Sequence, residues 1–431
     1  MDGLLCLTVN GLSESMLAVL AAVAAAARVN AAPPPRSVQP RWDPATLPVA
    51  FHSSNSTGNW DAEQIKQLAR FAMVTVEKWQ NIERYVPPDT LAAPSYADAG
   101  GLYNCQSGAD LSRCGCCAED DIVSALRKVK AVNPAVVTVA YLHSDIVQGW
   151  YRAAQHLAAE SDCWLRDRNG TLMPSWHGVH GCGNSGNCTW LLLDHSKPAC
   201  SELFAESCLA MTRTGAVDGC FVDGCNPAGS LPAGPTPEQG RAMVAGKLAM
   251  LAKLQTQVAG PLICGSTGAA SPSCRGVQAE GWGVETKRGF MFAQREIPML
   301  MAAMDAGVLF QAHGRAVCEH AGDPYHPAVQ TELAAFLVGM GPQAFYLCGA
   351  WEQCTTNPPL RPGRCAPNAN QTLWWPVYDM TLGEPLANAS KIDSVWHREF
   401  ASGTKVVFDT TTNTGKITWV AAQEKLPNTE W

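Results

Sequence analysis

The chain has 431 residues and a mass of 46.0 kDa, which suits one large domain or two to three ordinary ones. Hydrophobic residues make up 47% and charged residues 16%, a balance that excludes a disordered chain and predicts a large folded core. A net charge of −7 without long Lys/Arg runs excludes a nucleic-acid surface, and no glycine-rich phosphate loop occurs.

Residues 1–31 have the features of a cleaved signal peptide. The apolar segment 16–27 ends in small residues and is followed by a Pro-rich linker, residues 32–46. The region before the apolar segment lacks Lys and Arg and includes Glu14, and translation from Met16 would restore the usual pattern. An apolar core of about 12 residues is too short to span a bilayer, so we expect no transmembrane anchor after cleavage.

The cysteines and the glycosylation sequons also point to export. All of the 18 cysteines except Cys6 follow the signal segment, and this odd number leaves one thiol free or paired with another chain, as in a homo-oligomer. Cys114 has no second Cys-x-x-Cys at zinc spacing, and His177 and His180 lie in a Gly-rich loop. We therefore expect disulfides, and neither a metal nor another cofactor. Asn-x-Ser/Thr sequons occur at Asn55, Asn169, Asn187, Asn370 and Asn388.

After the linker, short apolar runs alternate with helical patterns. Strands are predicted at residues 47–52, 71–76, 136–142, 189–193, 219–222, 261–264, 281–284, 308–312 and 344–347. Helices are predicted at residues 61–69, 120–131, 199–212, 236–259, 297–306 and 329–340. Thr236 is placed to cap the fourth of these helices, with Pro237 in its first turn.

Strands and helices that alternate in this way call for a parallel sheet with helical crossovers. A doubly wound dinucleotide-binding sheet would carry a glycine-rich turn after its first strand, and this chain has none. The prediction is an α/β fold: a (β/α)8 TIM-type barrel over residues 47–394, with a small C-terminal β appendage over residues 395–431. The strand candidates exceed by one the eight that a closed barrel needs, so one of them must form another structure.

Polar residues follow the predicted strands directly. In a (β/α)8 barrel the C-terminal ends of the strands form one face, and that face carries the chemistry. Glycoside hydrolysis needs two carboxylates, one to protonate the leaving oxygen and one to act as nucleophile or to activate water. The strand-end candidates are Glu77, His143, Asp194, Asp223, Glu285 and His313.

Each acid has a structural alternative, because carboxylates also cap helices and bond to loops. Asp194 precedes a turn and a helix start, so a capping role suits it equally well. Asp223 has no helix directly after it, and Gly224 lets the chain turn sharply beside the carboxylate. Glu285 lies in a glycine-rich segment, where Glu280 is a nearby competitor.

Tryptophans stand beside several of these residues. Indole faces suit both the stacking of sugar rings and ordinary core packing, so a single Trp does not distinguish the two. Trp79 and Trp282 are the candidates for substrate contact, together with Glu77, His143 and His313.

The run TWLLLDHSKPACSELFAE, followed by GAVDGCFVDGCN, resembles glycosyl-hydrolase-like (β/α)8 barrels. In that group a strand-end Asp, a helix, and a strand of the form Asp-Gly, three apolar residues and Asp follow in order. The later GWGVET and HREFASGTKVVFD resemble the same group, so the similarity spans residues 48–408. It implies functional roles for Asp194, Asp223 and Glu285, with Glu77 lining the site. The dense cysteines and Asp409-Thr-Thr, where Asn-Pro is more usual, depart from the group.

The predicted function is that of a secreted glycoside hydrolase that acts on a poly- or oligosaccharide. Asp223 would be the nucleophile or base and Glu285 the general acid, while Asp194 and Glu77 would orient substrate hydroxyls. The alternative is a non-catalytic extracellular glycoprotein that binds glycan or forms part of a cell-surface structure, because disulfides and sequons fit both.

Overall fold

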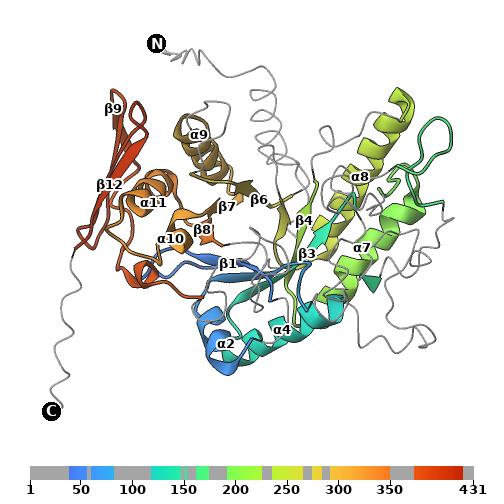
Figure 1. Cartoon of the computed structure of the whole chain (residues 1–431), viewed down its shortest axis with the longest axis horizontal. Coiled ribbons are helices and arrows are strands. Elements are labelled where there is room, and N and C mark those ends of the chain that lie inside the picture. The colour runs from blue at the N-terminus through green and yellow to red at the C-terminus, as the bar shows by residue number, and fades with distance from the viewer. Residues whose placement is uncertain are drawn as a thin grey trace, which may run out of the picture.

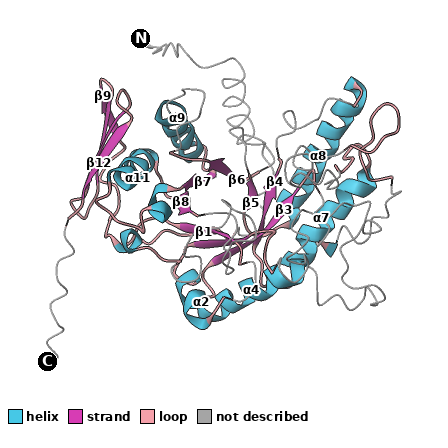
Figure 2. Cartoon of the chain, in the orientation of Figure 1, coloured by secondary structure: helices cyan, strands magenta, loops and turns pink. Residues whose placement is uncertain are grey.

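The computed structural model describes residues 38–55, 60–81, 118–146, 151–152, 162–173, 192–225, 235–265, 274–283, 292–349 and 373–420. Eight parallel strands follow one another around a barrel (Figures 1 and 2). They are β1 (Ala50–Ser53), β2 (Met73–Val76), β3 (Val137–His143), β4 (Gly219–Asp223), β5 (Leu262–Cys264), β6 (Gly276–Glu280), β7 (Leu309–Gly314) and β8 (Ala344–Cys348).

The sheet closes between its first and last strands. Val49, just before β1, forms a parallel bridge with Tyr346 of β8, whose N–H donates to the Pro48 carbonyl at 2.8 Å. The strands keep their sequence order, β1 to β8, so each neighbouring pair is joined by a crossover. This confirms the predicted (β/α)8 barrel.

Helices surround the barrel on its outer side (Figure 1). They are α2 (Ala62–Leu68), α4 (Ala118–Val132), α7 (Pro198–Thr212), α8 (Pro237–Gln257), α9 (Phe292–Asp305), α10 (Ala316–Glu319) and α11 (Pro327–Gly339). The Thr236 side chain accepts from Gln239 N–H at 3.1 Å, which confirms the predicted cap of α8. Asp61 caps α2 in the same way, within a capping box that it forms with Gln64.

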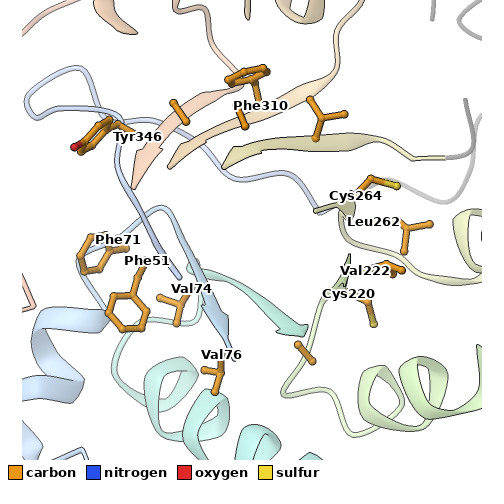
Figure 3. Packing of buried hydrophobic residues seen from close by; sticks show 14 of the residues in the cluster. Phe51, Phe71, Val74, Val76, Cys220, Val222, Leu262, Cys264, Phe310 and Tyr346 are labelled. Carbon is orange, nitrogen blue, oxygen red and sulfur yellow. The ribbon is translucent and has the colours of Figure 1, made fainter. Parts of the chain in front are cut away.

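Alternation along the strands decides which side chains enter the barrel. On β4, Phe221 belongs to the inner apolar cluster, whereas Cys220 and Val222 belong to the layer between strands and helices. Figure 3 shows that outer layer, with Phe51 and Phe71 on one side of the view and Cys220 and Val222 on the other. Asp223, two residues after Phe221, therefore ends β4 on the inner side.

Two predicted strands are wrong. Of the run 189–193 the structure describes Leu192 and Leu193, which form single antiparallel bridges to Ile146 and Trp164 within the β3–α7 connection. This run is the surplus candidate, because the eight barrel strands are accounted for without it. The sixth strand is β6 and not residues 281–284, because residues 281–283 form a turn that follows it.

The C-terminal segment forms a separate antiparallel sheet, which starts before the predicted boundary at residue 395. It lies against α11, and a Cβ on Gly415 would stand 2.5 Å from the Ala334 Cβ, so only glycine allows this approach. Arg398 reaches the end of α11 and donates to the carbonyls of Leu337 and Val338, which the helix itself leaves without partners. The strands, in the order β12-β11-β10-β9, are β9 (Ser390–Ile392), β10 (Val395–Glu399), β11 (Lys405–Asp409) and β12 (Thr414–Thr418).

Glu332 on α11 carries a buried carboxyl group behind the ends of β7 and β8. It accepts the backbone N–H of Arg315 and of Ala316, each at 3.1 Å, and the hydroxyl of Tyr346. Burial raises the pKa of Glu332 to about 7, although these three donors oppose the shift. The carboxyl group therefore titrates near neutral pH in the folded chain.

We expect Glu332→Gln to be more stable than the wild type at pH 8, with the difference shrinking at pH 5. The pKa of Glu332 in the folded chain lies above its usual value of 4.5, so the wild type loses stability as pH rises from about 4.5 through about 7. Glutamine has no proton to lose, so its relative gain reaches at most about 3 kcal/mol.

Urea unfolding at pH 5 and pH 8 measures this difference. Glu238→Gln is the matched control, because Glu238 is an exposed carboxylate on α8 that does not act on the Glu332 carboxyl group, so its substitution should leave the pH dependence unchanged. A Glu332→Gln effect that is equal at both pH values would contradict the prediction.

Candidate active site

The C-terminal ends of the strands place a polar cluster at one end of the barrel interior. Residues two apart on a strand share a face, so the strand-end groups continue the inner rows of the core. Register pairs His143 of β3 with Asp223 of β4, and Glu280 of β6 with His313 of β7. The described members of the cluster are His52, Glu77, Lys78, Tyr141, His143, Asp223, Gln278, Gln311 and His313.

Asp223 is the partly exposed carboxylate of this cluster, with 20% of its side chain accessible. The Tyr141 hydroxyl donates to its Oδ2 at 2.7 Å, and the N–H of Gly224 donates to its Oδ1 at 2.8 Å. Burial raises the pKa of the Tyr141 hydroxyl well above its usual value, and the Asp223 charge raises it further, so the tyrosine stays a donor. Asp223 is thus held in one orientation with one side open to solvent.

His143 faces Asp223 with a defined ring nitrogen. Its Nδ1 accepts the N–H groups of Asp145 and Ile146, each at 3.2 Å, so its proton resides on Nε2. Nε2 lies 4.0 Å from Asp223 Oδ2. Burial lowers the pKa of His143, and the attraction of Asp223 offsets this only in part. His143 is accordingly a neutral donor beside the carboxylate at neutral pH.

Glu77 is buried and fully engaged, with 1% of its surface exposed. Its Oε1 lies 2.9 Å from His52 Nε2, and its Oε2 lies 2.9 Å from Lys78 Nζ. Burial alone would raise the pKa of Glu77, but Lys78 and His52 outweigh it and hold the pKa below its usual range. Glu77 therefore anchors the cluster as a charged group, and the predicted contact with substrate hydroxyls does not fit its burial.

His52 connects Glu77 to the strands across the barrel. Gln278 Nε2 donates to His52 Nδ1 at 2.9 Å and also lies 3.2 Å from Gln311 Oε1. Because His52 Nδ1 accepts, its proton resides on Nε2 and is donated to Glu77. On the other side, Lys78 Nζ stands 4.0 Å above the ring of Tyr141, whose hydroxyl bonds Asp223. One continuous network thus joins β6 and β7, through β1, β2 and β3, to the end of β4.

A second set of buried groups supports the turn after Asp223. The Gly224 carbonyl accepts from Ser144 Oγ at 3.0 Å and from Lys247 Nζ at 2.9 Å, and Lys247 also forms an ion pair with Asp145. Gly224 has φ +70°, and a Cβ there would stand 2.8 Å from Asp145 Oδ2. Both the backbone conformation and the space require glycine, which agrees with the role predicted for it.

Asp194 does not belong to the strand-end cluster. Its Oδ1 accepts from the N–H of Ser196 at 3.0 Å and from the Ser196 hydroxyl, and it lies in the turn before α7. The structure therefore favours a loop hydrogen bond over a catalytic role, and Asp194 does not cap α7, whose N-cap residue is Lys197. Leu192 and Leu193 do not belong to a barrel strand, and only a barrel strand would have carried Asp194 to the strand-end cluster.

The two tryptophans predicted to touch substrate are core residues. Trp282 is fully buried, packs edge-on against Phe310 and Phe336, and donates toward the Glu332 carbonyl at 3.4 Å. Trp79 is likewise buried in the layer between strands and helices. Neither presents an indole face to solvent, so the packing alternative holds for both.

His313 stands at the end of β7 as predicted, but it is buried. Its Nε2 lies 3.0 Å from the Gly349 carbonyl, and its ring is stacked 6.4 Å from that of His52. Burial, with a smaller effect of the neighbouring His52, lowers the pKa of His313 to about 3, so the ring is neutral. His313 therefore lines the cluster as a neutral group and does not offer a charged contact to substrate.

Glu285 lies outside the described residues, as do His177, His180 and the sequons at Asn187 and Asn370. The acid that ends β6 is Glu280, the competitor of Glu285, and it is exposed. The sequon residues Asn169 and Asn388 are exposed, whereas Asn55 has 1% of its surface accessible. A glycan does not fit at so buried a position, so the burial of Asn55 argues against glycosylation there.

The sequence did not identify several members of the cluster. Tyr141 and His52 could have been found from the sequence, because each shares the inner face of its strand with a residue that was predicted for the site or that lies in the core. Gln278 and Gln311 had no such signal beyond position, since their partners come from other strands, and Lys78 had only its place beside Glu77, with which it forms an ion pair. Among the described residues, the group with the spacing of metal ligands is Cys225, Cys264 and Cys274.

The fold and the cluster together define a class, the glycosyl-hydrolase-like (β/α)8 barrels, whose chemistry resides at the C-terminal ends of the strands. Residues 130–404 match the family model described as hypothetical glycosyl hydrolase family 15. The match covers more than half of the chain, so the protein belongs to this family. No curated protein sequence matches it.

Solved structures of carbohydrate-active enzymes resemble the chain at low identity. The cycloalternan-degrading enzyme from Trueperella pyogenes is 15% identical with a TM-score of 0.41, over 72% of this chain and 44% of that one. An alpha-amylase from Malbranchea cinnamomea is 9% identical with a TM-score of 0.44, over 85% of each chain. Amy13B from Eubacterium rectale is 9% identical with a TM-score of 0.45, over 86% and 88%. The chain spans less than half the length of the first of these enzymes.

Proposed function

We propose that the protein is a glycoside hydrolase whose catalytic carboxylate is Asp223. The observation that carries the proposal is that the Asp223 carboxylate is held in a fixed orientation and is partly exposed. It ends an inner row of the barrel, it is fixed by Tyr141 and Gly224, and it remains partly open to solvent. An oriented carboxylate with one free side suits attack on an anomeric carbon or activation of a water molecule.

The second carboxylate would come from β6 or from the segment after it. Glu280 ends that strand two positions around the barrel from β4, and Glu285 follows a few residues later. Either could act as the general acid that protonates the leaving oxygen. His143, a neutral Nε2–H donor beside Asp223, would hold a substrate hydroxyl or the attacking water.

Export to an oxidising compartment forms part of the proposal. The described residues include the disulfides Cys163–Cys200, Cys208–Cys220 and Cys318–Cys348, which are typical of secreted proteins. The signal-like N-terminus and the exposed Asn169 and Asn388 sequons also support a secreted or cell-surface glycoprotein. Within the described ranges, every helix is too short or too polar to cross a bilayer.

A screen of the purified protein against poly- and oligosaccharides tests the function. Release of reducing ends is expected from at least one glycan, and it should be lost in Glu280→Gln or in Glu285→Gln, depending on which residue is the acid. The configuration of the newly released sugar then reports whether the enzyme retains or inverts it. Activity that survives both substitutions and Asp223→Asn would remove the assignment.

We expect Tyr141→Phe to lower kcat about 10- to 100-fold with little change in KM, the effect of losing one hydrogen bond to a charged group. Tyr141 is buried and reaches Asp223 without facing solvent, so substrate binding should be unaffected. Tyr151→Phe is the matched control, because that buried hydroxyl bonds the Tyr141 carbonyl and not the carboxylate. Equal kinetic losses in the two variants would contradict the prediction.

A non-catalytic, glycan-binding role is the second candidate. The burial of Glu77 in its contacts with His52 and Lys78 favours it, since such acids support structure rather than chemistry. In this case the screen would give binding to a glycan without release of reducing ends, and Asp223→Asn would weaken binding.

A further inference from the structure

Three cysteines from separate segments meet at the ends of β4 and β5. Cys225 follows Asp223 and Gly224, Cys264 ends β5, and Cys274 precedes β6. All three are buried, and their Sγ atoms all lie within 4.8 Å of one another. Figure 3 shows Cys264 at the end of its strand, beside the β4 residue Val222. No other group of this kind occurs in the described part of the chain.

Cys264 is placed to pair with either of its neighbours. Its Cα lies 5.5 Å from that of Cys225 and 6.0 Å from that of Cys274, and both separations suit a disulfide. A sulfur atom forms only one such bond, so whichever neighbour Cys264 does not bind is left without a disulfide partner among the described cysteines. The other described cysteines each have one partner, in Cys163–Cys200, Cys208–Cys220 and Cys318–Cys348.

The thiol left over stays beside the bond. Cys225 Sγ lies 2.9 Å from the Val222 carbonyl oxygen, which would accept the proton of the thiol form. It also lies 3.9 Å from Cys274 Sγ. A buried thiol this close to a disulfide can attack one of its sulfur atoms without a large movement. No other thiol among the described residues competes with it.

We propose that Cys225, Cys264 and Cys274 form a buried thiol–disulfide exchange site. Starting from the Cys264–Cys274 bond, Cys225 loses its proton and its thiolate attacks the sulfur of Cys264. The Cys225–Cys264 bond forms, the Cys264–Cys274 bond breaks, and Cys274 leaves as a thiolate that takes up a proton. The step exchanges one disulfide for another, so it needs neither an oxidant nor a reductant.

The two pairings anchor the candidate catalytic turn differently. With Cys225 bound to Cys264, the residue two positions after Asp223 is tied covalently to β5. With Cys274 bound instead, that turn is held by the hydrogen bonds of Ser144 and Lys247 to the Gly224 carbonyl. The exchange itself does not depend on the proposed hydrolase function, because it involves only the three sulfur atoms.

Disulfide mapping of the wild-type protein tests the site. The protein is quenched in acid, unfolded, alkylated and digested without reduction, and the linked peptides are identified by mass spectrometry. We expect both pairings, each in at least about a tenth of the molecules, as for two states of similar free energy. In each form the third cysteine should be alkylated. Cys208–Cys220 serves as the internal control and should appear as one pairing.

Serine variants give a second measurement. Cys274→Ser should contain only Cys225–Cys264, and Cys225→Ser should contain only Cys264–Cys274. A single pairing in the wild type, or a bond from one of the three to a cysteine elsewhere, would overturn the proposal. Three free thiols with one equivalent of bound zinc would also overturn it, and would make the cluster a metal site. The wild-type map remains decisive if a variant fails to fold.

Discussion

Asp223→Asn is expected to lower kcat for glycan hydrolysis by about 10³-fold or more while the protein stays folded. Asparagine keeps the size of the side chain, and its carbonyl oxygen can accept either the Tyr141 hydroxyl or the Gly224 N–H, so one of the two hydrogen bonds is kept. It has no negative charge, and therefore it can neither stabilise a developing cation nor form a glycosyl ester. Initial rates on the glycan found in the screen, with circular dichroism to verify folding, provide the measurement.

The same strand offers a matched control. Asp218 directly precedes β4 at the opposite end of the barrel, where its Oδ2 lies 2.6 Å from Lys130 Nζ and accepts the Thr138 N–H at 2.9 Å. Asp218→Asn should lower stability and leave kcat unchanged, because the substitution is equally conservative but lies far from the strand ends that form the site. A loss of activity of the same size in both variants would show that the β4 acids act through folding, and would end the assignment of Asp223.

Lys247→Met is expected to destabilise the fold by about 3–5 kcal/mol, because it leaves the carboxylate of Asp145 buried without its counter-charge. Lys247 has 4% of its surface exposed and reaches from α8 to Asp145 and to the carbonyl of Gly224. Methionine fills the space of the aliphatic stem, so the cavity contribution is small. The free energy of unfolding in urea, with the disulfides intact, measures the effect.

Two further variants show whether charge is the cause. Lys253→Met removes a lysine from the same helix, but its ion pair with Glu202 is half-exposed, so the cost should stay below about 1 kcal/mol. The double variant Asp145→Asn with Lys247→Met should recover part of the loss, because no buried charge then lacks a partner. Equal costs for Lys247→Met and Lys253→Met would contradict the role given to the buried pair.

The sequence predicted the barrel because its strands are apolar on both faces along most of their length. The same apolar pattern predicted a strand wrongly where a run of residues is buried for another reason. Leu192 and Leu193 are apolar because they pair with Ile146 and Trp164 inside a long connection, and no local pattern separates this from a barrel strand. The position of β6 was predicted wrongly because Gln278 points into a polar part of the interior, so the strand lacks an apolar run.

The site was predictable only in part, for a similar reason. Asp223 follows an apolar strand and precedes a glycine, and both signals are local. Of the partners of Glu77, Lys78 is adjacent in sequence, but His52 comes from a neighbouring strand, and nothing in sequence spacing indicates that the His52 and Glu77 side chains meet. Lys247 was recognisable from the sequence pattern, because it lies on the buried face of α8 with Met243 and Leu254. A single cation on such a face implies a buried anion nearby.

The chain of hydrogen bonds through Gln311, Gln278, His52 and Glu77 has a direction. Gln278 gives its amide protons to both neighbours, which sets the tautomer of His52 and in turn points its remaining proton at Glu77. Turning the Gln278 amide around would set its carbonyl oxygen against two acceptors, His52 Nδ1 and Gln311 Oε1, and would disturb both pairs. These positions should therefore have changed in evolution as a set, and a relative that replaces Gln278 should also carry compensating residues at the positions of Gln311 and His52.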